Sequence, residues 1–269
     1  MRRTLNLYYR LLAVQMRGQM QYRLSFIFEM VINGAMLSLY FVSLVLILQR
    51  FDNIGGWHLG EVALLYGLAE IAFGLADMIF SGFDAQLFGG RIRRGEFDQL
   101  LLRPVDITLQ VLGSKFVLRR LGRIIQGGII FGYALSLIDL HWTLLKVLYL
   151  PYIILGMITF FGGLFVVGAT ITFWTIQSVE VMNIFTYGGQ EMVSYPMHIY
   201  PQWLQRFFTF VLPAMFINYY PVLYLLDKPD PLALPAITPL LAPLAGLVVL
   251  ALALQFWRFG LTRYQSTGS

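Results

Sequence analysis

Long runs of residues without a charged side chain are the feature that most constrains this chain. Four such runs cover residues 30–49, 147–179, 207–226 and 231–257. A helix needs roughly 20 apolar residues to cross the ~30 Å hydrocarbon core of a bilayer, and each run reaches that length. The chain is 58% hydrophobic and 12% charged, whereas soluble domains carry about 25% charged residues. We therefore expect an all-α integral membrane protein.

Charges and prolines divide the chain into six predicted transmembrane helices. Residues 178–226 allow two readings. Either 207–226 crosses the membrane after a cytoplasmic loop at 178–206, or 178–198 crosses and 200–226 dips back from the outside as a re-entrant segment. We favour the second, because Pro196, Pro201, Pro213 and Pro221 break any continuous helix. The predicted spans are 26–48, 60–82, 115–139, 147–173, 178–198 and 235–258, in a single transmembrane domain over 1–269.

The basic residues predict the orientation. With the N-terminus inside, 15 of the 19 Lys and Arg residues fall on the cytoplasmic side. Positively charged segments are retained there, so both termini are expected in the cytoplasm. The run at 30–49 is too long for a cleavable signal and is expected to remain as an anchor. Residues 1–24 alternate arginines with apolar residues at helical spacing, which predicts an interfacial helix on anionic headgroups.

Several function classes lack their sequence signals. The chain has no cysteine, and its three histidines are far apart, so no metal site is expected. No GxxxxGK[ST] motif is present, which argues against nucleotide binding by a P-loop in this chain. We expect no enzymatic activity and no cofactor here. Transport would then draw its energy from a partner or from an ion gradient.

The segment 84–106, DAQLFGGRIRRGEFDQLLLRPVD, is the longest charged stretch. On a short helix, Phe97, Leu100 and Leu101 would share one face between charged flanks. Such a helix, held between two spans, is well shaped to sit in a cleft of a soluble partner. The alternative is an ordinary basic loop that lies on headgroups.

Two motifs resemble a known family. GEFDQLLLRP (95–104), followed by SYPMHIYPQWLQRFFTFVLPAMFINYYP (194–221), is similar to the ABC-2-type permeases of bacterial ABC exporters, the group described as ABC-2 family transporter protein. The resemblance covers essentially the whole chain and implies an ABC-2 exporter fold. In it, the loop after the second span forms a coupling helix on a separate ATPase. The coupling residues would be Arg91, Arg93, Arg94, Gly95, Glu96, Phe97, Asp98, Leu101, Arg103 and Pro104.

The resemblance also implies an outer gate and a set of partners. Two ATPase subunits, which bind ATP and Mg²⁺, would drive export by alternating access through an interface between two identical or related permeases. Spans one, two and five would receive the motion and line the path. The cargo is not specified, and no nucleic acid is expected. Gate or path residues would include Tyr195, Pro196, Tyr200, Pro201, Pro213, Asn218, Tyr219 and Pro221.

Ionisable residues inside spans are costly and require an explanation. Glu70 and Asp77 are seven residues apart and share a face of the second span, and Asn33 lies near the inner end of the first. Either these groups line the path and meet cargo, or the acids pair with Arg119, Arg120 or Arg123. We favour ion pairs. Alternative functions are a proton-coupled transporter that uses Glu70 and Asp77, or a scaffold without transport. Glycine pairs at 127–128 and 162–163 predict close helix packing.

Overall fold

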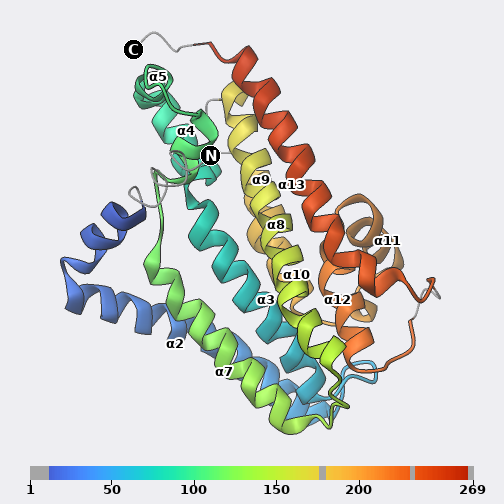
Figure 1. Cartoon of the computed structure of the whole chain (residues 1–269). Helices are drawn as coiled ribbons and strands as arrows, with labels where there is room; N and C mark the ends of the chain where they lie inside the picture. Colours follow the sequence, from blue (N-terminus) through green and yellow to red (C-terminus); the bar gives the residue numbers. More distant parts are fainter. Residues whose placement is uncertain (1–11, 176–179, 231–233, 266–269) are drawn as a thin grey trace.

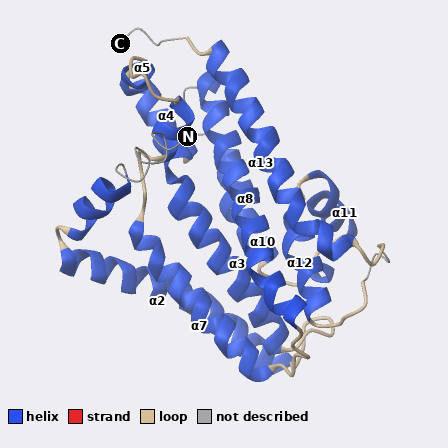
Figure 2. Cartoon of the chain, viewed as in Figure 1, coloured by secondary structure: helices blue, strands red, loops and turns tan. Residues whose placement is uncertain are grey.

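A computed structural model describes residues 12–175, 180–230 and 234–265, and these are helical with short connections (Figures 1 and 2). The sole strand-like feature of this described part is an isolated bridge between Ile54 and Trp57. Residues 1–11 of the predicted interfacial helix lie outside it. Residues 12–20 are helical, and a turn at 21–22 separates them from α2 (Arg23–Phe51).

Four helices of the described residues are long and apolar enough to cross a membrane. Three match predicted spans within a few residues, namely the first, fourth and sixth. The second predicted span forms α3 (Leu59–Phe80), which continues through the 3-10 turn η1 (Ser81–Phe83) into α4, so that together they make one candidate span. The four candidates are α2 (Arg23–Phe51), α3 to α4 (Leu59–Arg93), α8 (Leu144–Thr175) and α13 (Thr238–Arg263).

The other two predicted spans are short. The helix expected at 115–139 is α7 (Leu121–Leu137), whose 17 residues measure about 26 Å. Its predicted first residues form a linker and a 3-10 turn, η2 (Leu118–Arg120). Of the segment expected at 178–198, the described residues form α9 (Glu180–Asn183), the π-helical η3 (Ile184–Gly188) and α10 (Gly189–Val193), and the chain then turns at 194–196. The six-span count therefore stays a prediction.

The segment after Pro196 is a bent helical pair. A short 3-10 turn, η4 (Met197–Ile199), leads to α11 (Gln202–Arg206) and its π-helical continuation η5 (Phe207–Val211), and α12 (Ala214–Leu225) follows at 96° to that arm. The bend falls at Pro213, as predicted. The expectation that Pro221 also breaks the helix is wrong, because Pro221 lies inside α12. Buried neighbours surround this helix, and such packing tolerates one lost backbone hydrogen bond.

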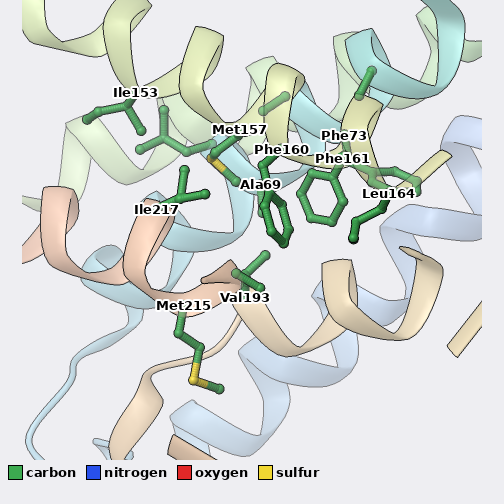
Figure 3. Close-up of a cluster of buried hydrophobic side chains, with 14 of the residues drawn as sticks. Ala69, Phe73, Ile153, Met157, Phe160, Phe161, Leu164, Val193, Met215 and Ile217 are labelled. Carbon is green, nitrogen blue, oxygen red and sulfur yellow. The ribbon is translucent and has the colours of Figure 1, made fainter. Parts of the chain in front are cut away.

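α3 lies at the centre of the bundle, between α7 and α8 (Figure 1). Figure 3 shows its Ala69 and Phe73 packed with side chains of α8, α10 and α12. Glycines bring the backbones together, as a Cβ added at Gly127 would lie 2.7 Å from the Cβ of Glu70. Gly162 and Gly163 are similarly crowded, whereas Gly128 faces open space. Apolar side chains gain little by leaving lipid for a protein interior, so helices in a membrane associate mainly through close van der Waals packing at small residues.

Candidate functional site

The charged segment 84–106 forms a helical hairpin at one end of the bundle. Asp84 caps α4 (Ala85–Arg93) by accepting a hydrogen bond from the Leu87 amide at 3.0 Å. Gly95, with φ of 67°, turns the chain into α5 (Glu96–Leu101), since this backbone region favours glycine. Asp106 then caps α6 (Ile107–Leu112) in the same manner as Asp84. We call the bundle end that carries this hairpin the basic end.

Phe97 anchors the hairpin to the bundle. Its side chain is fully buried, and its ring centroid lies 5.3 Å from Phe88, 5.4 Å from Phe173 and 4.9 Å from Tyr264. The helical spacing predicted one apolar face for Phe97, Leu100 and Leu101, but the structure buries Phe97 and leaves Leu101 42% exposed, so Phe97 is not on the exposed surface. The coupling role of this segment stays a prediction. Aromatic side chains from α8 and the end of α13 provide a pocket that the local helical pattern could not indicate.

The C-terminal part of α13 makes polar contacts with the hairpin and with α6, which follows it. The Tyr264 hydroxyl donates to Oδ1 of Asp98 at 3.0 Å, and Trp257 Nε1 donates to Oγ1 of Thr108 at 3.2 Å. Trp257 is fully buried and packs on Phe88. The hairpin is thus joined to α8 and α13 as one packed unit, although it follows α3 in sequence.

Part of the hairpin surface is exposed, at the turn and at the end of α5. Leu102 is 85% exposed and Leu101 is 42% exposed. Arg94 Nε lies 2.6 Å from Oε1 of Glu96, and the hydrogen bond from Arg94 holds the pKa of the Glu96 carboxyl below its usual range. Arg93, Arg103 and Pro104 are also exposed, whereas Arg91 donates from Nη1 to the Ser114 hydroxyl. The exposed surface of the hairpin combines a leucine pair with charges of both signs.

A buried polar cluster joins α3, α7 and α10 near the centre of the bundle. Arg123 Nε lies 2.6 Å from Oε2 of Glu70, and Gln190 Nε2 donates to Oε1 of Glu70 at 2.8 Å. Arg123 Nη2 also donates to Oε1 of Gln190 at 3.0 Å, and the guanidinium lies 4.7 Å from the centroid of the Phe73 ring. Each charge in this cluster has a partner, as a buried ion pair requires.

A second ion pair lies two turns along α3 toward the basic end. Arg120 Nε is 2.7 Å from Oδ2 of Asp77. The preference for ion pairs over free carboxylates is therefore confirmed for Glu70 and Asp77. Arg119 instead approaches Glu29 at 3.5 Å. Asn33 is exposed and donates to the backbone oxygen of Glu29, so it does not join the acids of α3.

The predicted gate residues lie at the opposite end, and several of them contact α3 or its preceding loop. The buried Asn218 side chain donates from Nδ2 to the backbone oxygens of Val193 at 2.8 Å and Leu65 at 3.3 Å. The Tyr219 ring stacks on Trp57 at 5.3 Å. Pro196 and Pro221 are buried, Pro201 is exposed, and the others are half-buried: Tyr195, Tyr200 and Pro213.

Some of these contacts involve residues that sequence reasoning did not single out. Lys228 Nζ lies 2.6 Å from Oε2 of Glu61 and 4.6 Å from the Trp57 ring centroid, and so ties the α12–α13 connection to the α2–α3 loop. Gln190 and Tyr264 were also missed. The sequence signal for Gln190 was a glutamine within an otherwise apolar stretch. Nothing in the sequence pointed to Tyr264. Among the described residues, no group of His, Asp and Glu could hold a metal ion.

A comparison with protein families identifies the class. The family model for the ABC-2 family transporter protein matches residues 35–268. The chain belongs to this family. No curated protein and no solved structure matches the chain. This ABC-2 permease is the membrane subunit of an ABC transporter, and the match includes the hairpin and the bent pair but begins after Asn33.

Proposed function

We propose that this permease moves its cargo out of the cytoplasm by alternating access, driven by a separate ATPase that docks on the basic end. The observation that carries the proposal is the α4–α5 hairpin, which exposes Leu101 and Leu102 at the end of α5, while Phe97 in the first turn of α5 is buried. Surface leucines with charges around them suit a protein partner better than water. The docking surface then consists of exposed side chains, and Phe97 supports it from inside.

The packing suggests how ATPase motion would reach the spans. Movement of the hairpin must displace α8 and α13, because Phe97, Tyr264 and Trp257 pack in one aromatic cluster. α8 contacts α3, and the Glu70 and Asp77 ion pairs join α3 to α7. A buried cluster with two discrete arrangements can carry such coupling, whereas a mobile loop cannot.

The assembly that we propose contains two ATPase subunits and two permeases, identical or related. ATP and Mg²⁺ would be bound by the ATPases. The basic end would lie in the cytoplasm of a bacterial inner membrane, with both termini inside, since the arginine-rich segments gather there. The six predicted crossings, with 200–226 as the outer re-entrant segment, fit this orientation. The class of cargo stays open.

Affinity purification in mild detergent tests the docking surface. The wild-type permease should retain an ATPase subunit, and Leu102→Asp should lose it, because a buried carboxylate at a leucine contact is unfavourable. Leu102 is 85% exposed, so insertion and folding should not change. Ile237→Asp is the matched control, since Ile237 is 56% exposed at the opposite end of the bundle. Equal retention in both variants, or no ATPase with the wild type, would contradict the proposal.

The energy source separates this function from a proton-coupled transporter. Transport in cells should stop on ATP depletion and persist when an uncoupler collapses the proton gradient. The reverse pattern would favour the proton-coupled alternative, and no transport under any condition would favour a scaffold. The arginine partners of Glu70 and Asp77 argue for the ATP-driven reading, because both carboxylates are already engaged in ion pairs that hold helices together.

A further inference from the structure

A pocket of about 410 Å³ lies at the elbow where the N-terminal helix meets α2. Its walls come from three places: the described N-terminal helix (residues 12–20), the first turns of α2, and the linker 115–119 before α7. Polar and charged side chains line one part of it, among them Gln15, Glu29, Lys115 and Arg119. Tyr22, Phe26 and Phe116 give the remainder an apolar wall. Of the contacts described above, the exposed Arg119–Glu29 pair lies at this pocket, and the hairpin and the Glu70 cluster do not line it.

Hydrogen bonds fix the shape of the pocket. Gln15 Nε2 donates to the Ser114 backbone oxygen at 3.0 Å. Gln19 Oε1 accepts from the Leu118 amide at 2.9 Å, and Gln19 Nε2 donates to the Phe116 oxygen. These side chains satisfy backbone groups of a linker that has no helical partners, and so they hold the N-terminal helix against it. The pocket is therefore a formed site between two secured walls.

The charges in the pocket favour an anion. The Lys115 side chain is half-buried, and no hydrogen bond or ion pair engages its ammonium within the described residues. Arg119 meets only the Glu29 carboxylate among charged groups there, at 3.5 Å, with both side chains about half exposed, so that pair is weak. The pocket thus holds two cations, Lys115 and Arg119, and one carboxylate, Glu29. The Lys115 ammonium can still bind an anion.

We propose that this pocket binds the headgroup phosphate of an anionic phospholipid in the adjacent leaflet. The assignment of a lipid over a free phosphate follows from the surroundings. The first turns of α2 expose apolar side chains, with Leu24 75% and Phe28 64% exposed, and these would lie against acyl chains next to the headgroup. In a bilayer, the phosphates of the headgroups lie directly above the acyl chains. The cations of the pocket and the exposed apolar side chains of α2 follow the same order. The proposal does not depend on ATP-driven export.

Glycine substitutions test the site without removing charge. A Cβ at Gly18, in the pocket wall, would meet nothing within 4 Å, so Gly18→Leu should fill the pocket without disturbing the backbone. Gly128 on α7 is equally open and lies outside the pocket, so Gly128→Leu is a matched control. The charge variant is Lys115→Gln with Arg119→Gln, and Arg258→Gln removes an exposed cation of α13 as its control.

Native mass spectrometry of the full-length permease in detergent, titrated with phosphatidylglycerol, phosphatidylcholine or inorganic phosphate, provides the measurement. We expect phosphatidylglycerol to bind in preference to phosphatidylcholine, and binding to weaken about tenfold in Gly18→Leu and in the double charge variant but not in either control. Equal binding of the two lipids, or unchanged binding in Gly18→Leu, would overturn the proposal. Binding of inorganic phosphate without the lipid would identify a free-anion site and would also overturn it.

Discussion

The guanidinium of Arg123 on α7 and the carboxylate of Glu70 on α3 form a buried ion pair with an Nε–Oε2 distance of 2.6 Å. The Arg123 and Glu70 side chains are 10% and 1% exposed. Gln190 on α10 completes the set by bonding to both. One polar cluster therefore joins three helices that are distant in sequence. Removing one of its members should lower the stability of the permease.

Arg123→Met should destabilise the permease by about 3–5 kcal/mol, because it leaves the Glu70 carboxylate buried without a counter-ion. Replacing both residues, as Glu70→Leu with Arg123→Met, should recover much of that loss, since no charge is then left unpaired. Thermal unfolding in detergent gives the comparison. A double variant no more stable than Arg123→Met would show that the cluster acts by other contacts.

Glu70→Gln should lower stability while leaving transport measurable. The amide keeps a hydrogen-bonding group toward Gln190, but it leaves the Arg123 charge without its carboxylate partner. Transport assays in vesicles and unfolding midpoints should be measured on the same preparations. Loss of transport at unchanged stability would instead assign Glu70 a direct role with cargo.

Asp77→Asn should cost less stability than Glu70→Gln. The partner of Asp77, Arg120, is 29% exposed, so its charge can be hydrated when the carboxylate is lost, whereas Arg123 is 10% exposed. The order of unfolding midpoints under identical detergent conditions checks this. An equal or larger loss in Asp77→Asn would show that exposure does not set the cost of these pairs.

Phe97→Ala should destabilise the hairpin by about 3–5 kcal/mol through loss of buried aromatic contacts. Its effect on ATPase association should be indirect and should follow the loss of structure. Leu102→Ala is the control, because Leu102 is exposed and its truncation should leave stability within about 0.5 kcal/mol. Limited proteolysis between Arg91 and Arg103 would report hairpin opening. A Phe97→Ala hairpin that stays protected would contradict the anchoring role.

Tyr264→Phe removes one hydroxyl and keeps the ring against Phe97. The hydrogen bond to Asp98 is lost, and we expect a modest cost of about 1 kcal/mol. If α13 transmits motion to the hairpin, stimulation of ATPase activity by cargo should fall more than ATPase binding does. Equal changes in binding and stimulation would show that this bond only stabilises the docked state.

Much of this architecture follows from local sequence patterns. Uncharged runs predict the long apolar helices, because a helix in lipid must satisfy its own backbone. Pro213 predicts the sharp bend before α12, since proline cannot continue the ladder of hydrogen bonds. Pro221 was misjudged because its effect depends on packing. Ion pairs of Glu70 and Asp77 with basic residues at 119–123 were the favoured prediction, since an unpaired charge inside a span is costly.

The sequence by itself thus determined the helical membrane class, a short helix within the charged segment 84–106 and the need for counter-ions on α3. Only the tertiary structure decided which arginine meets which acid, because that choice depends on the rotation and register of α7 against α3. It also decided that Phe97 faces inward, toward Phe173 and Tyr264. Short helices have an apolar face that fits either a partner or the protein's own core, and only long-range packing selects between them.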